Sequence, residues 1–195
     1  ESHGIITDPS TYTYQYDLKE RIFAESTRAH NCLLIDGLNY SRFNADAFGS
    51  SIEQVQEVGE VVMIEAKIHR NRLISETIPN NKIGAKDGVK VNISHRRVLI
   101  YHPEKFLVVI DDVDSPNEHT YSQCFQLYPD IELVREGKEY QLHKFISEEY
   151  RMIAKIRPLM PSELKMTDAK GQMEPYLCGW ISKNGHELEE APNIQ

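Results

Sequence analysis

Three polar residues near the start of the chain stand where a strand is expected to begin. The segment 26–37 reads STRAHNCLLIDG, and its residues Arg28, His30 and Asn31 come directly before an apolar run that closes in an Asp-Gly turn. Loops at strand ends are where proteins bring reactive groups together, so this segment predicts the edge of a site. The alternative is that its polar side chains only satisfy the backbone groups of a turn.

A second polar cluster, HRR at 95–97, lies inside a predicted strand. Adjacent residues of a strand face opposite sides, so His95 and Arg97 share one surface while Arg96 lies on the other. Burying an arginine is costly unless a carboxylate or another anion pairs with it. We therefore expect Arg97 either to form an internal ion pair with Asp111 or Asp112, which we favour, or to contact a bound anion.

Several function classes are excluded by what the chain lacks. There is no nucleophile elbow, phosphate-binding loop, dinucleotide fingerprint, HExxH motif or EF-hand loop. The net charge of −8 argues against binding to duplex nucleic acid, and the absence of a run of ~18 apolar residues argues against a membrane span. The cysteines lie far apart among apolar neighbours, which predicts buried free thiols rather than disulfides; they are Cys32, Cys124 and Cys178.

The elements that must position these residues are strands. Residues 58–69 and 89–101 alternate apolar and polar side chains, which predicts half-buried strands. The run 106–113 is apolar on both faces and follows a turn at 102–105, so we expect it to be a central strand in a hairpin with 89–101. Further short strands are expected at 119–128, 131–135, 139–146, 150–157 and 176–182. This spacing predicts an all-β fold, an antiparallel β-sandwich.

The chain length of 195 residues fits one domain over 1–195. Only 17–25 has a helical composition, and 158–175, with its three prolines, is the longest expected loop. The first residues lack the basic and apolar parts of a signal peptide, and they read as the middle of a protein without an initiating Met. We therefore expect the chain to be a fragment of a longer protein.

Blocks along the chain resemble consecutive blocks of the heparinase II/III-like C-terminal domain, in the same order and at the same spacing. They are GIITDPSTYTY at 4–14, ERIFAESTRAHNCLLIDG at 20–37, HRRVLIYHPEKFLVVIDDV at 95–113, HTYSQCFQLYPDIEL at 119–133 and PYLCGWIS at 175–182. The resemblance implies a β-sandwich that follows an N-terminal (α/α) toroid, which is missing here. It also implies a polysaccharide lyase that acts on uronic-acid-containing glycans, heparan/heparin-like or alginate-like, in the bacterial periplasm or outside the cell.

The chemistry implied by the resemblance is β-elimination. It needs a group that neutralises the uronate carboxylate, a base for the C5 proton and an acid for the departing O4. In the family an Asn and a Tyr come from the toroid and a His comes from the sandwich, and His30 matches that His. Its imidazole suits either proton role near neutral pH. The anionic polysaccharide would then be bound by Arg28 first, and by Asn31, Arg97 and Tyr40, and the chain without its toroid would be inactive.

The resemblance further implies a structural zinc or calcium ion, bound by His and Asp. The candidate ligands are Asp46 and His95, with His30 as the alternative. A ligand cannot also transfer protons freely, and we rank the catalytic role of His30 first. The sequence departs from the family pattern at Gln126, where a His is common, and at Ser10, where a Gly is common.

Two non-catalytic alternatives stay open. The first is a structural module that supports the toroid, with a polar cluster that is paired internally and holds no metal. The second is a carbohydrate-binding module, which needs exposed aromatic rings that stack on sugars. The candidate rings are Tyr12, Tyr14, Tyr16 and Tyr40.

Overall fold

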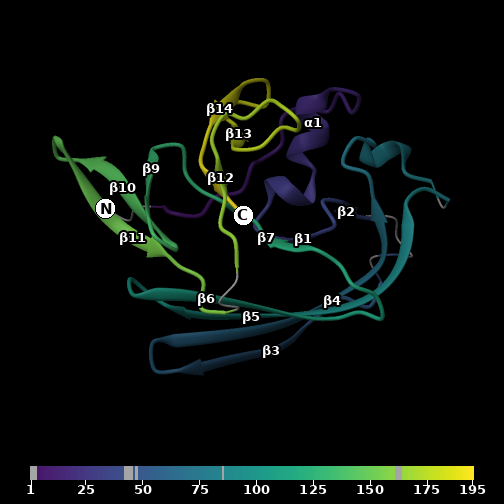
Figure 1. Ribbon diagram of the computed structural model, residues 1–195, viewed down its shortest axis with the longest axis horizontal. Helices are drawn as coiled ribbons and strands as arrows, with labels where there is room; N and C mark the ends of the chain where they lie inside the picture. The colour runs from purple at the N-terminus through teal and green to yellow at the C-terminus, as the bar shows by residue number, and fades with distance from the viewer. Residues whose placement is uncertain (1–3, 42–45, 47, 85, 161–163) are drawn as a thin grey trace. The chain divides into compact units, whose positions relative to one another are not determined.

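The computed structural model describes residues 4–41, 46, 48–84, 86–160 and 164–195 (Figure 1). These residues gather into two compact units. The first unit comprises Glu1–Leu34 and Ser122–Gln195, and the second unit comprises Ile35–Tyr121. The second unit is therefore an insertion in the sequence of the first. The single domain over 1–195 stays a prediction, and each unit is described by itself.

Almost all regular structure in the described residues is β, and the strand pairs among them are antiparallel, so the predicted all-β class of the antiparallel β-sandwich is confirmed. The helical elements are α1 (Lys19–Ala24), η1 (Thr27–Ala29) and η2 (Asn80–Lys82). The strands of the first unit, with β1 and β7 at its boundary, are β1 (Leu33–Ile35), β7 (Tyr121–Gln123), β8 (Phe125–Gln126), β9 (Ile131–Glu136), β10 (Glu139–Ile146), β11 (Glu149–Ile156), β12 (Asp168–Ala169), β13 (Trp180–Ser182), β14 (Leu188–Glu190) and β15 (Asn193–Ile194). Those of the second unit are β2 (Asn39–Tyr40), β3 (Ser51–Val58), β4 (Val61–Ile74), β5 (Val89–His102) and β6 (Phe106–Asp114).

The second unit is built on one five-stranded sheet with the order β2-β4-β5-β6, and β3 also pairs with β4. Figure 1 shows β4, β5 and β6 as long neighbouring ribbons. The register places Ala66, Arg97 and Asp111 side by side across β4, β5 and β6. Because strand side chains alternate between faces, His95 lies on the same face as Arg97 and Asp111. The shared face predicted for His95 and Arg97 is thus present.

For this sheet one strand prediction was wrong and one strand was missed. We expected 106–113 at the centre, but β6 pairs with β5 alone among the described strands, and β4 and β5 are central. Its outer residues Phe106 and Ile110 are accordingly exposed. The strand β3 was not predicted at all, because every residue in it is exposed and its sequence SIEQVQEV has no core face to reveal.

The first unit holds smaller sheets around two apolar clusters. The order β11-β10-β9 forms one three-stranded sheet, β12-β15-β8 forms another, and β13 pairs with β14. The larger cluster consists of Leu127, Ile131, Tyr140, Leu142, Met166 and Ile194. In the smaller one Phe23, Ala29 and Leu177 pack with Trp180, so α1, η1 and the region before β13 are joined by apolar burial.

The segment before α1 adds to the β12-β15-β8 sheet without forming a full strand. The Thr7 amide donates to the Gln126 carbonyl at 2.9 Å, and the Tyr128 amide donates to the Ile5 carbonyl at 3.1 Å. These bonds hold residues 5–8 beside β8. None of the three cysteines forms a disulfide, as predicted; Cys124 and Cys178 are buried as expected, whereas Cys32 is half-buried. Within the described residues, no helix is long and apolar enough to cross a membrane.

Candidate functional site

The polar turn that carries His30 is packed into the first unit. Ser26 caps η1 by accepting a hydrogen bond from the Ala29 amide at 3.3 Å. The three residues of η1 are buried, and Ala29 belongs to the smaller apolar cluster. His30 follows at the end of η1 in an extended conformation. The turn is therefore held by both a cap and core packing, and His30 has a defined position.

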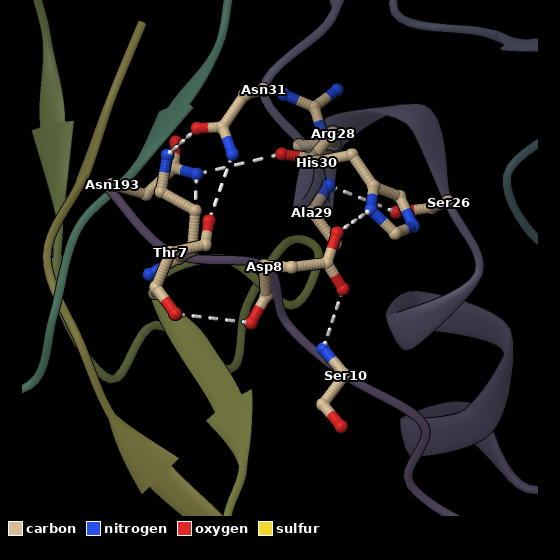
Figure 2. Close-up of polar contacts among 10 residues, drawn as sticks. Thr7, Asp8, Ser10, Ser26, Arg28, Ala29, His30, Asn31 and Asn193 are labelled. Carbon is tan, nitrogen blue, oxygen red and sulfur yellow. Dashed lines mark hydrogen bonds and ion pairs between the residues drawn. The ribbon is translucent and has the colours of Figure 1, made fainter.

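The imidazole of His30 is paired with a carboxylate that lies 22 positions earlier in the chain. The Nδ1 atom of His30 lies 2.8 Å from Oδ2 of Asp8. The other oxygen of Asp8 accepts a hydrogen bond from the Ser10 amide at 2.9 Å (Figure 2). The His30 side chain is 24% exposed and that of Asp8 65%. The Nε2 atom of His30 is buried and has no hydrogen-bond partner among the described residues.

Asn31 ties the same turn to its neighbours. Its amide nitrogen donates to the Thr7 carbonyl at 2.8 Å, and its amide oxygen accepts from the Gln126 amide at 2.8 Å. Both ends of the side chain thus serve internal contacts (Figure 2). The predicted contact of Asn31 with a polysaccharide stays a prediction, and its visible role is to join the N-terminal segment, the turn and β8.

Arg28 is 6% exposed and points into the first unit. Its NH1 group donates to Oε1 of Gln195 at 3.0 Å, and its guanidinium carbon lies 3.9 Å from the centre of the Tyr176 ring. Such a stack stabilises a cation. Figure 2 shows the guanidinium and the His30 imidazole pointing in different directions. Binding of a substrate anion by Arg28, predicted from the resemblance, stays a prediction.

A chain of buried amides lies under the turn, and nothing in the sequence pattern predicted it. Gln126 and Asn193 are both fully buried. The Gln126 amide nitrogen donates to the Pro192 carbonyl at 3.1 Å, and Asn193 donates to Oε1 of Gln126 at 3.1 Å. Gln195 donates to the Asn193 side-chain oxygen at 3.3 Å. In the sequence, Gln126 stood out only because a His is common at this position in the family, and this gave no sign of the amide contacts.

The second unit contains the other predicted site residues. The Arg97 Nε atom lies 2.6 Å from Oδ1 of Asp111, its NH2 group lies 2.8 Å from Oδ2, and the His95 Nε2 atom lies 2.6 Å from Oδ1. The internal ion pair that we favoured for Arg97 is confirmed, and Asp111 rather than Asp112 is the partner. Substrate binding by Arg97 has no support from this geometry, because its guanidinium is held by a buried carboxylate.

Asp46 belongs to a separate polar group in this unit. Its Oδ2 atom accepts hydrogen bonds from Ser41 at 2.6 Å and from Nε of Arg72 at 2.8 Å. Burial alone would raise the pKa of Asp46, but the hydrogen bonds from Ser41 and Arg72 outweigh it and hold the pKa below its usual range. Tyr40, the predicted sugar contact, has its ring 4.8 Å from the Arg70 guanidinium carbon.

The second unit contains another pair of a histidine and a carboxylate, His119 with Asp36, which was not predicted. His119 Nδ1 lies 2.6 Å from Oδ2 of Asp36, whose other oxygen accepts from the Thr120 amide at 2.8 Å. Burial would raise the pKa of Asp36, but the hydrogen bonds from His119 and Thr120 lower it by more. The sequence predicted the Asp-Gly turn that contains Asp36. It did not predict that His119, 83 positions later, would pair with this aspartate.

Comparison with known proteins identifies the family of this chain. The family model described as heparinase II/III-like, C-terminal, matches residues 2–158. The chain belongs to this family. A solved structure described as a heparinase III, the BT4657 gene product, superposes with a TM-score of 0.66 at 16% identity. That match covers 97% of this chain and 25% of the solved one. This chain thus spans about a quarter of the length of that solved structure. At this level of identity the likeness shows the fold alone. The comparison with curated proteins found no match.

The heparinase II/III-like family implies a zinc or calcium ion, for which Asp46, His95 and alternatively His30 were the predicted ligands. Asp46 holds Arg72, and the His95 Nε2 atom lies against Asp111, whereas the Nδ1 atom of His95 and the Nε2 atom of His30 have no partner among the described residues. Within the described parts of the chain, no three His, Cys, Asp or Glu side chains gather as ligands. A site for the ion needs several such ligands together, so this geometry gives the predicted ion no support, and no step below depends on one.

Proposed function

We propose that this heparinase II/III-like domain is the C-terminal part of a polysaccharide lyase that cleaves uronic-acid-containing glycans, heparan/heparin-like or alginate-like, by β-elimination. In this proposal the domain supplies His30 to a cleft completed by the N-terminal (α/α) toroid of the same protein. The substrate is an anionic polysaccharide. Family membership supports the reaction class, and the position of His30 supports its role.

The proposed step conserves atoms and electrons. A base removes the proton from C5 of the uronate, and the electron pair left behind forms a C4–C5 double bond. The bond between C4 and the glycosidic O4 breaks, and O4 leaves with a proton supplied by an acid. An imidazole suits one of these proton transfers because its ordinary pKa of about 6.5 lies near working pH. We assign that transfer to His30.

The observation that carries the proposal is the pairing of His30 with Asp8. The 2.8 Å contact occupies Nδ1, while Nε2 has no partner within the described structure. A histidine that served only the turn would use its ring to bind backbone groups of the turn, and no such bond to the His30 ring is present among the described residues. A carboxylate at Nδ1 orients the imidazole and leaves the buried Nε2 atom as the nitrogen without a partner, which supports the proposed role.

The test uses the full-length protein and the ultraviolet absorbance of the unsaturated product. We expect His30→Ala to lower turnover by roughly 10²–10⁴-fold, the range for a lost proton-transfer group, with little change in melting temperature. His186→Ala, which removes an exposed histidine of the same unit, should keep wild-type turnover. Full turnover of His30→Ala would contradict the proposal. Elimination by the isolated chain would show that the active site does not need the toroid.

The second candidate is a non-catalytic structural module. It is favoured by the internal contacts of Arg28 with Gln195 and of Asn31 with Thr7 and Gln126. This role predicts that His30→Ala lowers the melting temperature and leaves turnover per folded molecule unchanged. A carbohydrate-binding module would instead require that Tyr14, whose ring is exposed, bind sugar, and Tyr14→Ala would then weaken retention on a glycan column.

A further inference from the structure

We infer that Asp8 is the positioning residue of the proposed proton transfer: it holds His30 as the tautomer protonated on Nδ1 and so leaves Nε2 as the nitrogen that exchanges the proton. The inference rests on the proposed function. It goes further because it assigns a role to a residue outside the polar turn and names the reacting nitrogen.

The place of Asp8 is set by the residue before it. Thr7 donates through its amide to the Gln126 carbonyl at 2.9 Å and accepts through its carbonyl from Asn31 at 2.8 Å. Thr7 therefore contacts Asn31 while Asp8 contacts His30, so two successive residues of one segment bind two successive residues of the other. The segment that carries Asp8 cannot shift without breaking these contacts and the pairing to β8.

The orientation of the Asp8 carboxylate is set by Ser10. The Ser10 amide donates to Oδ1 of Asp8 at 2.9 Å. Ser10 has a φ of 63°, in the left-handed region, and this bend returns its amide toward the Asp8 side chain in a local Asx-type turn. One carboxylate oxygen is thus used by the backbone, and the other, Oδ2, is directed to Nδ1 of His30.

The position of the proton follows from the chemistry of the two groups. An ionised carboxylate only accepts hydrogen bonds, so the Nδ1 atom that contacts it must carry hydrogen. A neutral imidazole has one N–H, and Nε2 then holds a lone pair. The Nε2 atom of His30 has no partner among the described residues, so no group there competes for that lone pair.

A simple surface ion pair is the competing explanation. The Asp8 side chain is 65% exposed, and exposed pairs add little to stability. A loss of stability would therefore not separate the two roles. The Asn and Ala variants at this position separate them, because they differ in the tautomer that they impose on His30.

In Asp8→Asn the Ser10 amide still requires an oxygen acceptor, so the amide oxygen stays with Ser10 and the NH₂ group faces His30. An NH₂ donor at Nδ1 forces the proton onto Nε2, which is the wrong tautomer for a base at Nε2. Asp8→Ala imposes neither tautomer. We therefore expect turnover in the order wild type, Asp8→Ala, Asp8→Asn, with a 10–100-fold loss for Asp8→Asn, as for residues that orient a catalytic group, and little change in KM.

The experiment combines turnover of the full-length protein with nitrogen-15 NMR of the His30 ring. In the wild type we expect the shifts of an Nδ1-protonated neutral imidazole, and in Asp8→Asn those of the Nε2-protonated form. Asp130→Asn, which changes an exposed carboxylate paired with Lys144, is the matched control and should match the wild type in both measurements.

Each outcome decides one of the two ideas. Wild-type His30 protonated on Nε2, or Asp8→Asn at least as active as Asp8→Ala, overturns the role of Asp8 and leaves the proposed function standing. Full turnover of His30→Ala overturns the proposed function whatever the tautomer. The predicted tautomers together with the predicted order of turnover support the inference.

Discussion

Arg97 and Asp111 face each other across β5 and β6 and form a two-point ion pair, with contacts of 2.6 and 2.8 Å. The side chains are 15% and 4% exposed, so the pair is largely withdrawn from water. On the opposite face of β5, Arg96 makes a similar two-point pair with Glu65, but its side chain is 50% exposed. The two neighbouring arginines thus place similar contacts in different environments.

The buried pair should control the stability of the second unit. Arg97→Met removes the arginine that neutralises the buried Asp111 carboxylate and should lower the free energy of unfolding by about 3–5 kcal/mol, measured by urea denaturation. Arg96→Met is the control and should change it little, because solvent screens the exposed pair. Adding Asp111→Leu to Arg97→Met should recover part of the loss. Equal losses for the two arginine variants would contradict this account.

Asp46 should contribute to stability at neutral pH and lose that contribution in acid. Its pKa is lowered in the folded chain, so the contribution is complete above the ordinary value of about 3.9 and disappears as pH falls through the lower folded value. Asp46→Asn should therefore be less stable than wild type at neutral pH and approach wild type as the pH falls through the lowered pKa of Asp46. The urea midpoint across this range is the measurement, and a constant difference would refute the prediction.

Tyr140 should make the stability of the chain depend on pH in the alkaline range. Burial and then the 2.5 Å hydrogen bond to Asp168 raise the pKa of Tyr140 to about 12. Its contribution to stability is complete below the ordinary value of about 10 and is lost as pH rises through about 12. Tyr140→Phe should lower the free energy of unfolding by about 1 kcal/mol near neutral pH. Between about pH 10 and 12 the stability of this variant should depend less on pH than that of wild type. Tyr14→Phe, at an exposed ring, should behave like wild type in urea denaturation.

The buried amides of Gln126 and Asn193 should contribute to the stability of the first unit. Gln126→Leu keeps the volume but removes the donor to the Pro192 carbonyl and the acceptor for Asn193. We expect a loss of about 1–3 kcal/mol in the free energy of unfolding, because polar groups stay buried without their partner. Gln54→Leu in the exposed strand β3 is the control and should stay within about 0.5 kcal/mol of wild type.

Metal removal tests the predicted ion directly. Because Asp46 and His95 bind Arg72 and Asp111, we expect a chelator to leave the melting temperature unchanged. Metal analysis of wild type and His30→Ala gives the second measurement. Bound zinc or calcium that His30→Ala releases, together with a lower melting temperature, would reverse the ranking of the two roles of His30.

The strands were predictable because alternation is a local property. The expected strand at 139–146 coincides with β10, and 89–101 differs from β5 by one residue. The pairing of Arg97 with an aspartate of the next strand also followed from alternation and the short turn between β5 and β6. Local pattern failed for β3, whose residues are all exposed, and for β6, whose apolar residues suggested a centre but lie at an edge.

What the sequence by itself determined is the all-β class, most strand positions, the lack of disulfides and the family, because each depends on short stretches or their order. Only the tertiary structure decided which side chains meet. Asp8 and His30 are 22 positions apart, and Asn193 and Gln126 are 67 apart, so no local period relates them. Their contacts depend on the pairing of residues 5–8 and β15 with β8, which is made by backbone hydrogen bonds and long-range burial rather than by any single segment.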